Sequence, residues 1–212
     1  MSLLYYSRIR LIENFIPLLQ ASSLPAHVIS VFGPQRDGKL HLNDLSLRNP
    51  QNYSFNTMCS HVAYLKTFYF EHLAAQHPTI AFTHYFPNLV ITAAFTAKEA
   101  NLWFRVLWRF VGPLAALVAV GQEECARRVL FLASDRFPAR GNGKREDAEG
   151  TGVAESSDGV SGGGAYRVDW NGENIAVKKN YQQLRADGAG EKFVKHTQEL
   201  LKSVDAGEVF KN

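Results

Sequence analysis

The stretch TIAFTHYFPNLVIT, residues 79–92, constrains the fold more than any other part of the sequence. Its large apolar residues favour β-structure, and such a run bounded by turn residues is typical of a strand buried inside a sheet. Pro87 and Asn88 then predict a turn that carries the chain out of the sheet and places Thr92 just beyond it. The chain is therefore expected to build its core around an internal strand.

Helical and strand patterns alternate around this segment. Apolar residues recur at helical spacing over 3–20, 57–76 and 121–134, and AHVISVFG at 26–33 predicts a short strand that ends on glycine. The residues from 34 to 56 include Pro, Gly, Asp and Asn at intervals, which favours a long surface connection. Helices that alternate with strands favour an α/β fold.

The last third of the chain changes in character. Small polar residues dominate 139–164, which predicts a flexible loop. Two short strands about the Asn-Gly dipeptide at 171–172 are expected next, and the tail favours one final helix. We therefore expect a single domain in three parts: 1–138, the loop, and a last strand with the C-terminal tail over 165–212.

The segment 102–120 has the length of a membrane span, but its residues argue against one. Arg105 and Arg109 would lie inside the bilayer, where a charged residue costs about 2.5–3.5 kcal/mol. Gly112 and Pro113 are also expected to break the helical pattern. Two interpretations remain: a buried or substrate-covering helix pair, and an amphipathic helix in contact with a membrane surface.

Charge and cysteine content exclude several classes of protein. The 212 residues include 23 Lys and Arg against 20 Asp and Glu, and the basic residues are scattered, so no nucleic-acid partner is expected. Cys59 and Cys125 form no CxxC motif, which favours a reducing, cytoplasmic location. The seven histidines show no metal-binding spacing, so no metal site is expected.

The order of these elements resembles the C-terminal half of a short-chain dehydrogenase/reductase, over residues 1–138 and again at 164–175. VISVFG resembles that family's fifth strand, and FPNLVIT resembles its sixth-strand ending, Pro-Gly-x-Val-x-Thr. RVLFLAS and GGAYRVDWNG resemble its seventh helix and last strand. GKLHLNDLSLRNPQNYS is most similar to the retinol-dehydrogenase-like branch common in fungi, whose members often serve secondary metabolism. The resemblance implies a partial Rossmann-like, doubly wound domain that lacks the N-terminal strands and the glycine-rich turn.

The resemblance also implies a cofactor and a reaction. In that family the turn after the sixth strand approaches the nicotinamide, and the threonine contacts the cofactor. The matching residues are Pro87, Asn88, Val90 and Thr92, which become the candidate binding residues for NADP or NAD. Asn88 replaces the family's glycine, and asparagine tolerates a left-handed backbone better than most residues. The implied reaction is oxidoreduction of a lipophilic alcohol or ketone.

The family's catalytic residues have no counterpart in this sequence. A tyrosine and a lysine four residues later form its proton-transfer pair, because the ammonium one helical turn away lowers the pKa of the phenol. No Tyr-x-x-x-Lys occurs here, and alignment places Cys59 and Ala63 at those two positions. Phe32 or Gly33 falls where the catalytic serine belongs.

Neighbouring residues do not replace the missing pair. Tyr64 and Lys66 are two residues apart and are expected on different faces of one helix, as are Cys59 and His61. Ser30 matches a structural asparagine position of the family. No catalytic residue is therefore assigned.

Three interpretations of the function remain open. The first is an oxidoreductase that needs a longer product or a partner chain. The second is a non-catalytic descendant that binds a small apolar ligand or associates with other chains. The third is a truncated gene product. An open sheet edge beside strand 26–32 favours a homo-oligomer or pairing with a longer relative. By resemblance, the helices 3–20 and 57–76 are those that form the family's dimer.

Overall fold

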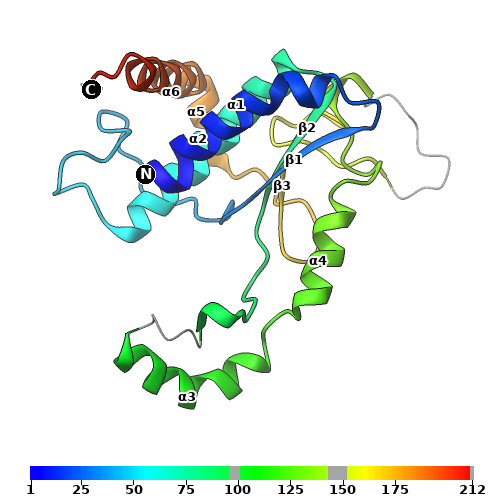
Figure 1. Cartoon of the computed structure of the whole chain (residues 1–212). Helices are drawn as coiled ribbons and strands as arrows, with labels where there is room; N and C mark the ends of the chain where they lie inside the picture. Colours follow the sequence, from blue (N-terminus) through cyan, green and yellow to red (C-terminus); the bar gives the residue numbers. More distant parts are fainter. Residues whose placement is uncertain (96–100, 143–151, 211–212) are drawn as a thin grey trace.

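The centre of the computed structural model is a three-stranded parallel sheet in the order β1-β2-β3 (Figure 1). The structure describes residues 1–95, 101–142 and 152–210. Its strands and helices are β1 (Ala26–Val31), β2 (Ile80–Tyr85), β3 (Ala165–Val168), α1 (Ser7–Gln20), α2 (Phe55–Gln76), α3 (Leu102–Ala116), α4 (Gln122–Phe131), α5 (Lys179–Ala186) and α6 (Ala189–Asp205). A π-helical turn, Ser2–Tyr6, precedes α1, and two 3-10 turns occur at Ala93–Phe95 and Arg140–Asn142.

The expected internal strand is β2, which pairs with β1 on one side and with β3 on the other. Ile80 pairs with Ala26, and Phe82 pairs with both Val28 and Ala165. All six residues of β2 are buried, as their β-prone apolar character predicts. The α/β class and the partial Rossmann-like arrangement are confirmed by this parallel sheet and its flanking helices.

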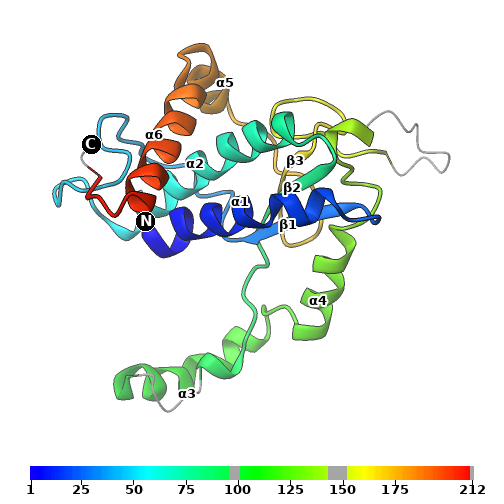
Figure 2. The same ribbon diagram turned by 45° about the horizontal axis from the view of Figure 1, so that its top comes forward.

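Helix α2 lies on one face of the sheet and is buried on nearly every side (Figure 2). Ser54 caps its first turn by accepting a hydrogen bond from the Thr57 amide at 3.1 Å. A helix that is apolar on most of its surface must pack against other elements on most sides. Helices α1 and α6 pack on the sides of α2 that do not face the sheet. Tyr5, in the π-helical turn that precedes α1, contacts both other helices: its hydroxyl lies 3.4 Å from the Leu65 carbonyl of α2 and 2.9 Å from the Thr197 hydroxyl of α6.

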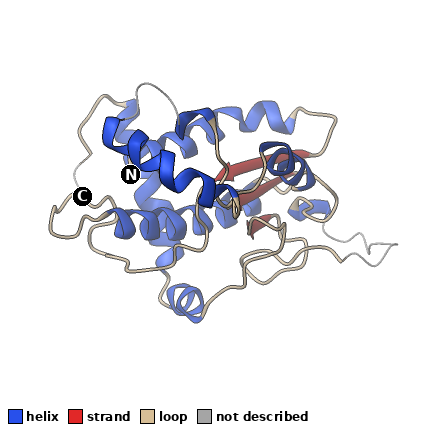
Figure 3. Ribbon diagram, turned by 90° about the horizontal axis from the view of Figure 1, so that it is seen from below, coloured by secondary structure: helices blue, strands red, loops and turns tan. Residues whose placement is uncertain are grey.

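The opposite face of the sheet carries a second, smaller core. Tyr85, Tyr166 and Phe137 pack there, and the Tyr166 hydroxyl donates to the Pro138 carbonyl at 2.6 Å. The segment that follows α4 covers this face as a loop, whereas helices cover the first face. Figure 3 shows how small a part of the molecule the strands form beside the surrounding helices and loops.

Helix α3 differs from the expectation in one respect. Gly112 and Pro113 do not break it, and the helix continues to Ala116. A proline inside a helix removes one hydrogen bond, and here the neighbouring turns preserve the helical path. No helix among the described residues is both long enough and apolar enough to cross a membrane.

The C-terminal part also differs in detail from the expectation. The turn at 171–172 forms, with Gly172 at a φ of 82°, but only an isolated bridge from Val168 to Asn174 follows instead of a second strand. Two helices form the tail where one was expected, because Gly188 adopts a left-handed φ of 67° between α5 and α6. The described residues of the expected loop, 139–142 and 152–164, contact the body of the protein, so that Ser157 donates to Glu71 at 2.7 Å. Its flexibility stays a prediction.

A buried ion pair joins three distant parts of the chain. The Arg167 side chain on β3 is 1% exposed, and its Nη2 donates to both oxygens of Asp37 at 2.9 and 2.8 Å. The Tyr181 hydroxyl on α5 donates to the same carboxylate at 2.8 Å, and Lys178 approaches it to 3.3 Å. The long connection after β1 is thereby fixed to β3 and α5.

Replacement of Asp37 tests the structural role of this pair. Asp37→Asn leaves the buried Arg167 charge without its carboxylate, so we expect a loss of about 3–5 kcal/mol in the free energy of unfolding. Asp205→Asn is the matched control, because its pair with Arg10 is partly exposed and such pairs contribute about 0–1 kcal/mol. Urea denaturation measures both. Equal, small losses in the two variants would contradict a structural role for the buried pair.

Candidate functional site

The carboxyl edge of the sheet gathers the segments that follow all three strands. The Phe32 amide donates to the Tyr85 carbonyl at 2.9 Å, and the Phe86 amide donates to the Val168 carbonyl at 3.0 Å. The sheet is thus continued by one residue at its carboxyl ends before the chain turns away. In open parallel sheets, ligands bind in the crevice outside this edge.

The turn after β2 contains the four candidate cofactor-binding residues. Pro87 and Asn88 leave the strand, and Asn88 adopts a left-handed φ of 62°, the conformation that glycine adopts most readily. Val90 forms a parallel bridge with Val120, and the Val120 amide donates to the Leu89 carbonyl at 2.8 Å. Thr92 follows as an exposed residue. The turn therefore has a left-handed residue at the position where the family motif has glycine, while contact of these residues with a cofactor stays a prediction.

Just below this edge, three polar side chains occupy one row across the sheet. Ser30, His84 and Arg167 are each the penultimate residue of their strand, and the register pairs Ser30 with His84 and His84 with Arg167. We call these three residues the polar row. They are 7%, 0% and 2% exposed, so the row is enclosed beneath the helices of the first face.

Lys66 of α2 extends its side chain to the polar row. Its Nζ donates to the Ser30 hydroxyl at 3.0 Å and lies 5.3 Å from the centre of the Phe32 ring. Phe32 in turn stacks on His84 with ring centres 6.3 Å apart. Burial, and to a smaller degree the nearby Arg8 charge, lowers the pKa of Lys66 to about 7. Burial also lowers the pKa of His84 well below its usual range, with Lys66 and Arg167 adding to the effect.

The residues at the family's catalytic positions are packed inside the core. Cys59 is 3% exposed, and burial raises the pKa of its thiol, which therefore stays protonated near neutrality. Ala63 is fully buried. Tyr64 contacts the Gly38 carbonyl at 3.4 Å and accepts a hydrogen bond from Asn180. Tyr64 and Lys66 thus have different partners, which agrees with their expected places on different faces of the helix.

The sequence interpretation assigned no role to Lys66, His84 or Arg167. A signal for them was present, since a lysine within an otherwise apolar stretch of helix and polar residues at equal distances from three strand ends are both unusual. Their mutual contact depends on the strand register, which no residue pattern specifies. No hydrogen bond links either ring nitrogen of His84 to another described residue.

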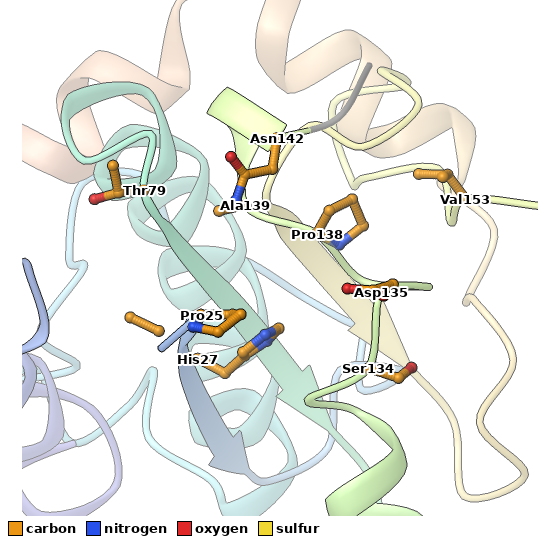
Figure 4. Close-up of a pocket in the computed structure, with 10 residues that line it drawn as sticks. Pro25, His27, Thr79, Ser134, Asp135, Pro138, Ala139, Asn142 and Val153 are labelled. Atoms are coloured by element: carbon orange, nitrogen blue, oxygen red, sulfur yellow. The ribbon is translucent and has the colours of Figure 1, made fainter. Parts of the chain in front are cut away.

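A separate cavity lies at the opposite, amino end of the sheet (Figure 4). It encloses about 210 Å³, and His27, Thr79, Ser134 and Asp135 contribute polar groups to its wall. Burial lowers the pKa of His27, which Asp135 partly counteracts. Within the described residues no hydrogen bond connects Ser134 to His27, so the histidine does not activate this hydroxyl. No described group of His, Cys, Asp and Glu is arranged to hold a metal ion.

The lowered pKa of Lys66 predicts a pH dependence of stability. Between pH 7 and the unfolded value near 10.5, the unfolded chain binds more protons than the folded chain, so Lys66 makes stability rise with pH. We expect the free energy of unfolding to increase from pH 7 to 8.5, by at most about 1.4 kcal/mol per pH unit from this group. Lys66→Met should flatten the rise.

Urea denaturation at several pH values within this window measures the effect. Lys195→Met provides a matched control, because that side chain is 77% exposed and its removal should leave the slope unchanged. Parallel pH curves for the natural chain and Lys66→Met would show that the buried lysine is not responsible for the slope.

Comparison with known proteins gives fungal relatives over nearly the whole chain. The short-chain dehydrogenase/reductase SAT2 of Stachybotrys chartarum is 34% identical over 207 residues, which cover 96% of this chain and 58% of that protein. An oxidoreductase of Emericella nidulans is 32% identical over 206 residues, covering 94% of this chain and 60% of the relative. An NmrA-like family domain-containing oxidoreductase of an Aspergillus strain is 28% identical over 204 residues, covering 96% and 57%.

The chain spans less than two thirds of the length of these relatives. No family model matches the chain, and no solved structure matches it. The chain is nevertheless similar, over nearly its whole length, to fungal oxidoreductases that include a short-chain dehydrogenase/reductase.

Proposed function

We propose that the chain forms the carboxyl-edge part of a nicotinamide-dinucleotide site in an oxidoreductase. The observation that supports this most directly is the left-handed Asn88 in the turn after the central strand, at the edge where parallel sheets bind such ligands. In this proposal Pro87 and Asn88 let the backbone approach the nicotinamide, Val90 packs beside it, and the Thr92 hydroxyl contacts the cofactor. NADP and NAD are both compatible with these residues.

The proposed substrate is a lipophilic alcohol or ketone. Directly beyond Thr92, Phe95 packs against Trp108 with ring centres 4.4 Å apart, and Phe104 stacks on Trp108 at 5.9 Å. This aromatic cluster supplies an apolar surface next to the proposed nicotinamide position. The fungal relatives named as oxidoreductases support a reaction of this class, and we propose a role in fungal secondary metabolism.

The chain alone is not expected to complete the reaction. It contains no glycine-rich phosphate turn and no Tyr-x-x-x-Lys, and Cys59 and Ala63 supply no general acid in their place. We propose that the activity needs a longer product or a partner chain. A homo-oligomer would cover Leu11, Phe15 and Leu18 of α1, which are 57%, 47% and 68% exposed beside the free edge of β1.

A second candidate function follows from the same packed positions. A family member whose catalytic positions hold Cys59 and Ala63 fits a non-catalytic protein that binds a small apolar ligand or assembles with a relative. The two functions predict different results for cofactor binding. A folded chain that binds neither NADPH nor NADH supports the non-catalytic alternative.

Isothermal titration calorimetry with NADPH and with NADH tests the proposed site. We expect binding that Thr92→Val weakens about threefold to tenfold, because one hydrogen bond contributes about 0.5–1.5 kcal/mol. Asn88→Gly should keep the affinity, since glycine adopts the same left-handed backbone, whereas Asn88→Val should lower it. Thr79→Val is the matched control, an exposed threonine at the opposite edge of the sheet.

An absorbance assay with ketones and either reduced cofactor tests catalysis by the chain alone. We expect no turnover above background, since loss of a general acid costs on the order of 10²–10⁴ in rate. Robust turnover by the purified 212-residue chain would contradict the proposal that the chain alone cannot catalyse the reaction. Equal affinities of the Thr92→Val and Thr79→Val variants for the cofactor would contradict the proposed contact of Thr92 with it.

A further inference from the structure

Helix α3 stands apart from the rest of the molecule. Figures 1 and 2 both show α3, joined to α4, projecting away from the sheet and from helices α1, α2 and α6. None of its residues is buried, although its sequence is largely apolar. An exposed apolar surface of this extent marks an interaction site in a folded protein.

The helix has two distinct apolar faces. On the inner face, Phe104 and Trp108 pack on Phe95, so this face already has a partner within the chain. The outer face repeats at helical spacing and is exposed, and its Trp103 ring meets the adjacent Phe104 ring edge-on with centres 5.9 Å apart. It consists of Trp103 (66% exposed), Val106 (52%), Leu107 (50%), Phe110 (72%), Leu114 (68%) and Leu117 (82%).

The charges beside the outer face are all of one sign. Arg105 and Arg109 are exposed, one turn apart, on the polar side of α3, and neither forms an ion pair with a described residue. The sequence contains no Asp or Glu from 101 to 121. A partner of this helix is therefore expected to offer an apolar region to the outer face and negatively charged groups to the two arginines.

We propose that the outer face of α3 binds an anionic lipid surface, with the helix lying in the plane of the membrane. Its apolar residues would enter the boundary between headgroups and acyl chains, where tryptophan is favoured, and the two arginines would contact lipid phosphates. The inference does not depend on the proposed cofactor site.

Two other occupants of the outer face fit less well. A second copy of α3 in a symmetric dimer would cover the outer face but would leave Arg105 and Arg109 of both helices without an acidic partner on α3. Insertion across the bilayer is excluded by the length of the helix, which is 15 residues where about 20 are needed.

Vesicle co-sedimentation tests the proposal on the full chain. We expect binding to phosphatidylcholine vesicles that contain phosphatidylserine, and weaker binding to phosphatidylcholine alone. Arg105→Gln and Arg109→Gln should each weaken the anionic binding by about fivefold. Phe110→Glu should reduce it at least tenfold, while Leu130→Glu, at an equally exposed leucine of α4, should leave it unchanged.

Tryptophan fluorescence supplies a second measurement at the residue level. In a Trp108→Phe, Trp170→Phe background, Trp103 should shift to the blue on vesicle addition and be quenched by brominated lipid. Circular dichroism confirms that each variant is folded.

Several results would overturn the proposal: no vesicle binding by the folded chain, equal losses for Phe110→Glu and Leu130→Glu, or Trp103 fluorescence that vesicles leave unchanged. A concentration-dependent dimer in sedimentation experiments that Phe110→Glu abolishes would also overturn it, in favour of a second copy on this face.

Discussion

Asp37 contributes a buried carboxylate to a region rich in basic side chains, and its pair with Arg167 holds the first and last parts of the fold together. Arginine keeps its charge in proteins, so a guanidinium that is 1% exposed requires a close negative partner. The connection after β1 supplies that partner, and Tyr181 of α5 donates to one of the same two oxygen atoms. The long segment between β1 and α2 is thus ordered by electrostatics more than by secondary structure.

The rest of the polar row follows from the same constraint. Asp37 is already paired with Arg167, Tyr181 and Lys178, and among the described residues neither Lys66 nor His84 forms an ion pair with an acidic side chain. Burial lowers the pKa of both groups, and the Ser30 hydroxyl accepts the hydrogen bond that Lys66 donates. This arrangement lies one residue below the carboxyl edge, so buried polar groups lie directly beneath the proposed cofactor site. The stability of this region is expected to depend on pH near neutrality.

The two proposed surfaces of the protein meet at one short segment. Residues 86–92 carry the candidate cofactor contacts and connect β2 to the region of α3. Val90 and Val120 pair where the chain enters and leaves this region, so the projecting helices are anchored at the same edge that would bind the nicotinamide. A lipophilic substrate and a lipid-facing helix would then lie on the same side of the sheet.

Local sequence patterns were enough to predict most of the secondary-structure order, the internal strand and the turn at Pro87 and Asn88. These features depend on local patterns: β-prone apolar runs, helical spacing and turn residues. The sequence also indicated a short-chain dehydrogenase/reductase-like family from motifs at the strand ends, and the names of the fungal relatives support that indication. It placed the break at Gly112-Pro113 wrongly, since a helix tolerates an internal proline when its neighbouring turns remain intact.

The membership of the polar row depends on tertiary packing and could not be predicted from local patterns. Ser30, His84 and Arg167 are far apart in the chain, and their contact depends on a register that is set when three strands pair and α2 covers them. The partner of Asp37 and the lowered pKa of Lys66 follow from that packing, because desolvation is a property of the assembled core. The exposed outer face of α3 was likewise decided by the fold, since an apolar helical pattern is the same whether a core or a membrane covers it.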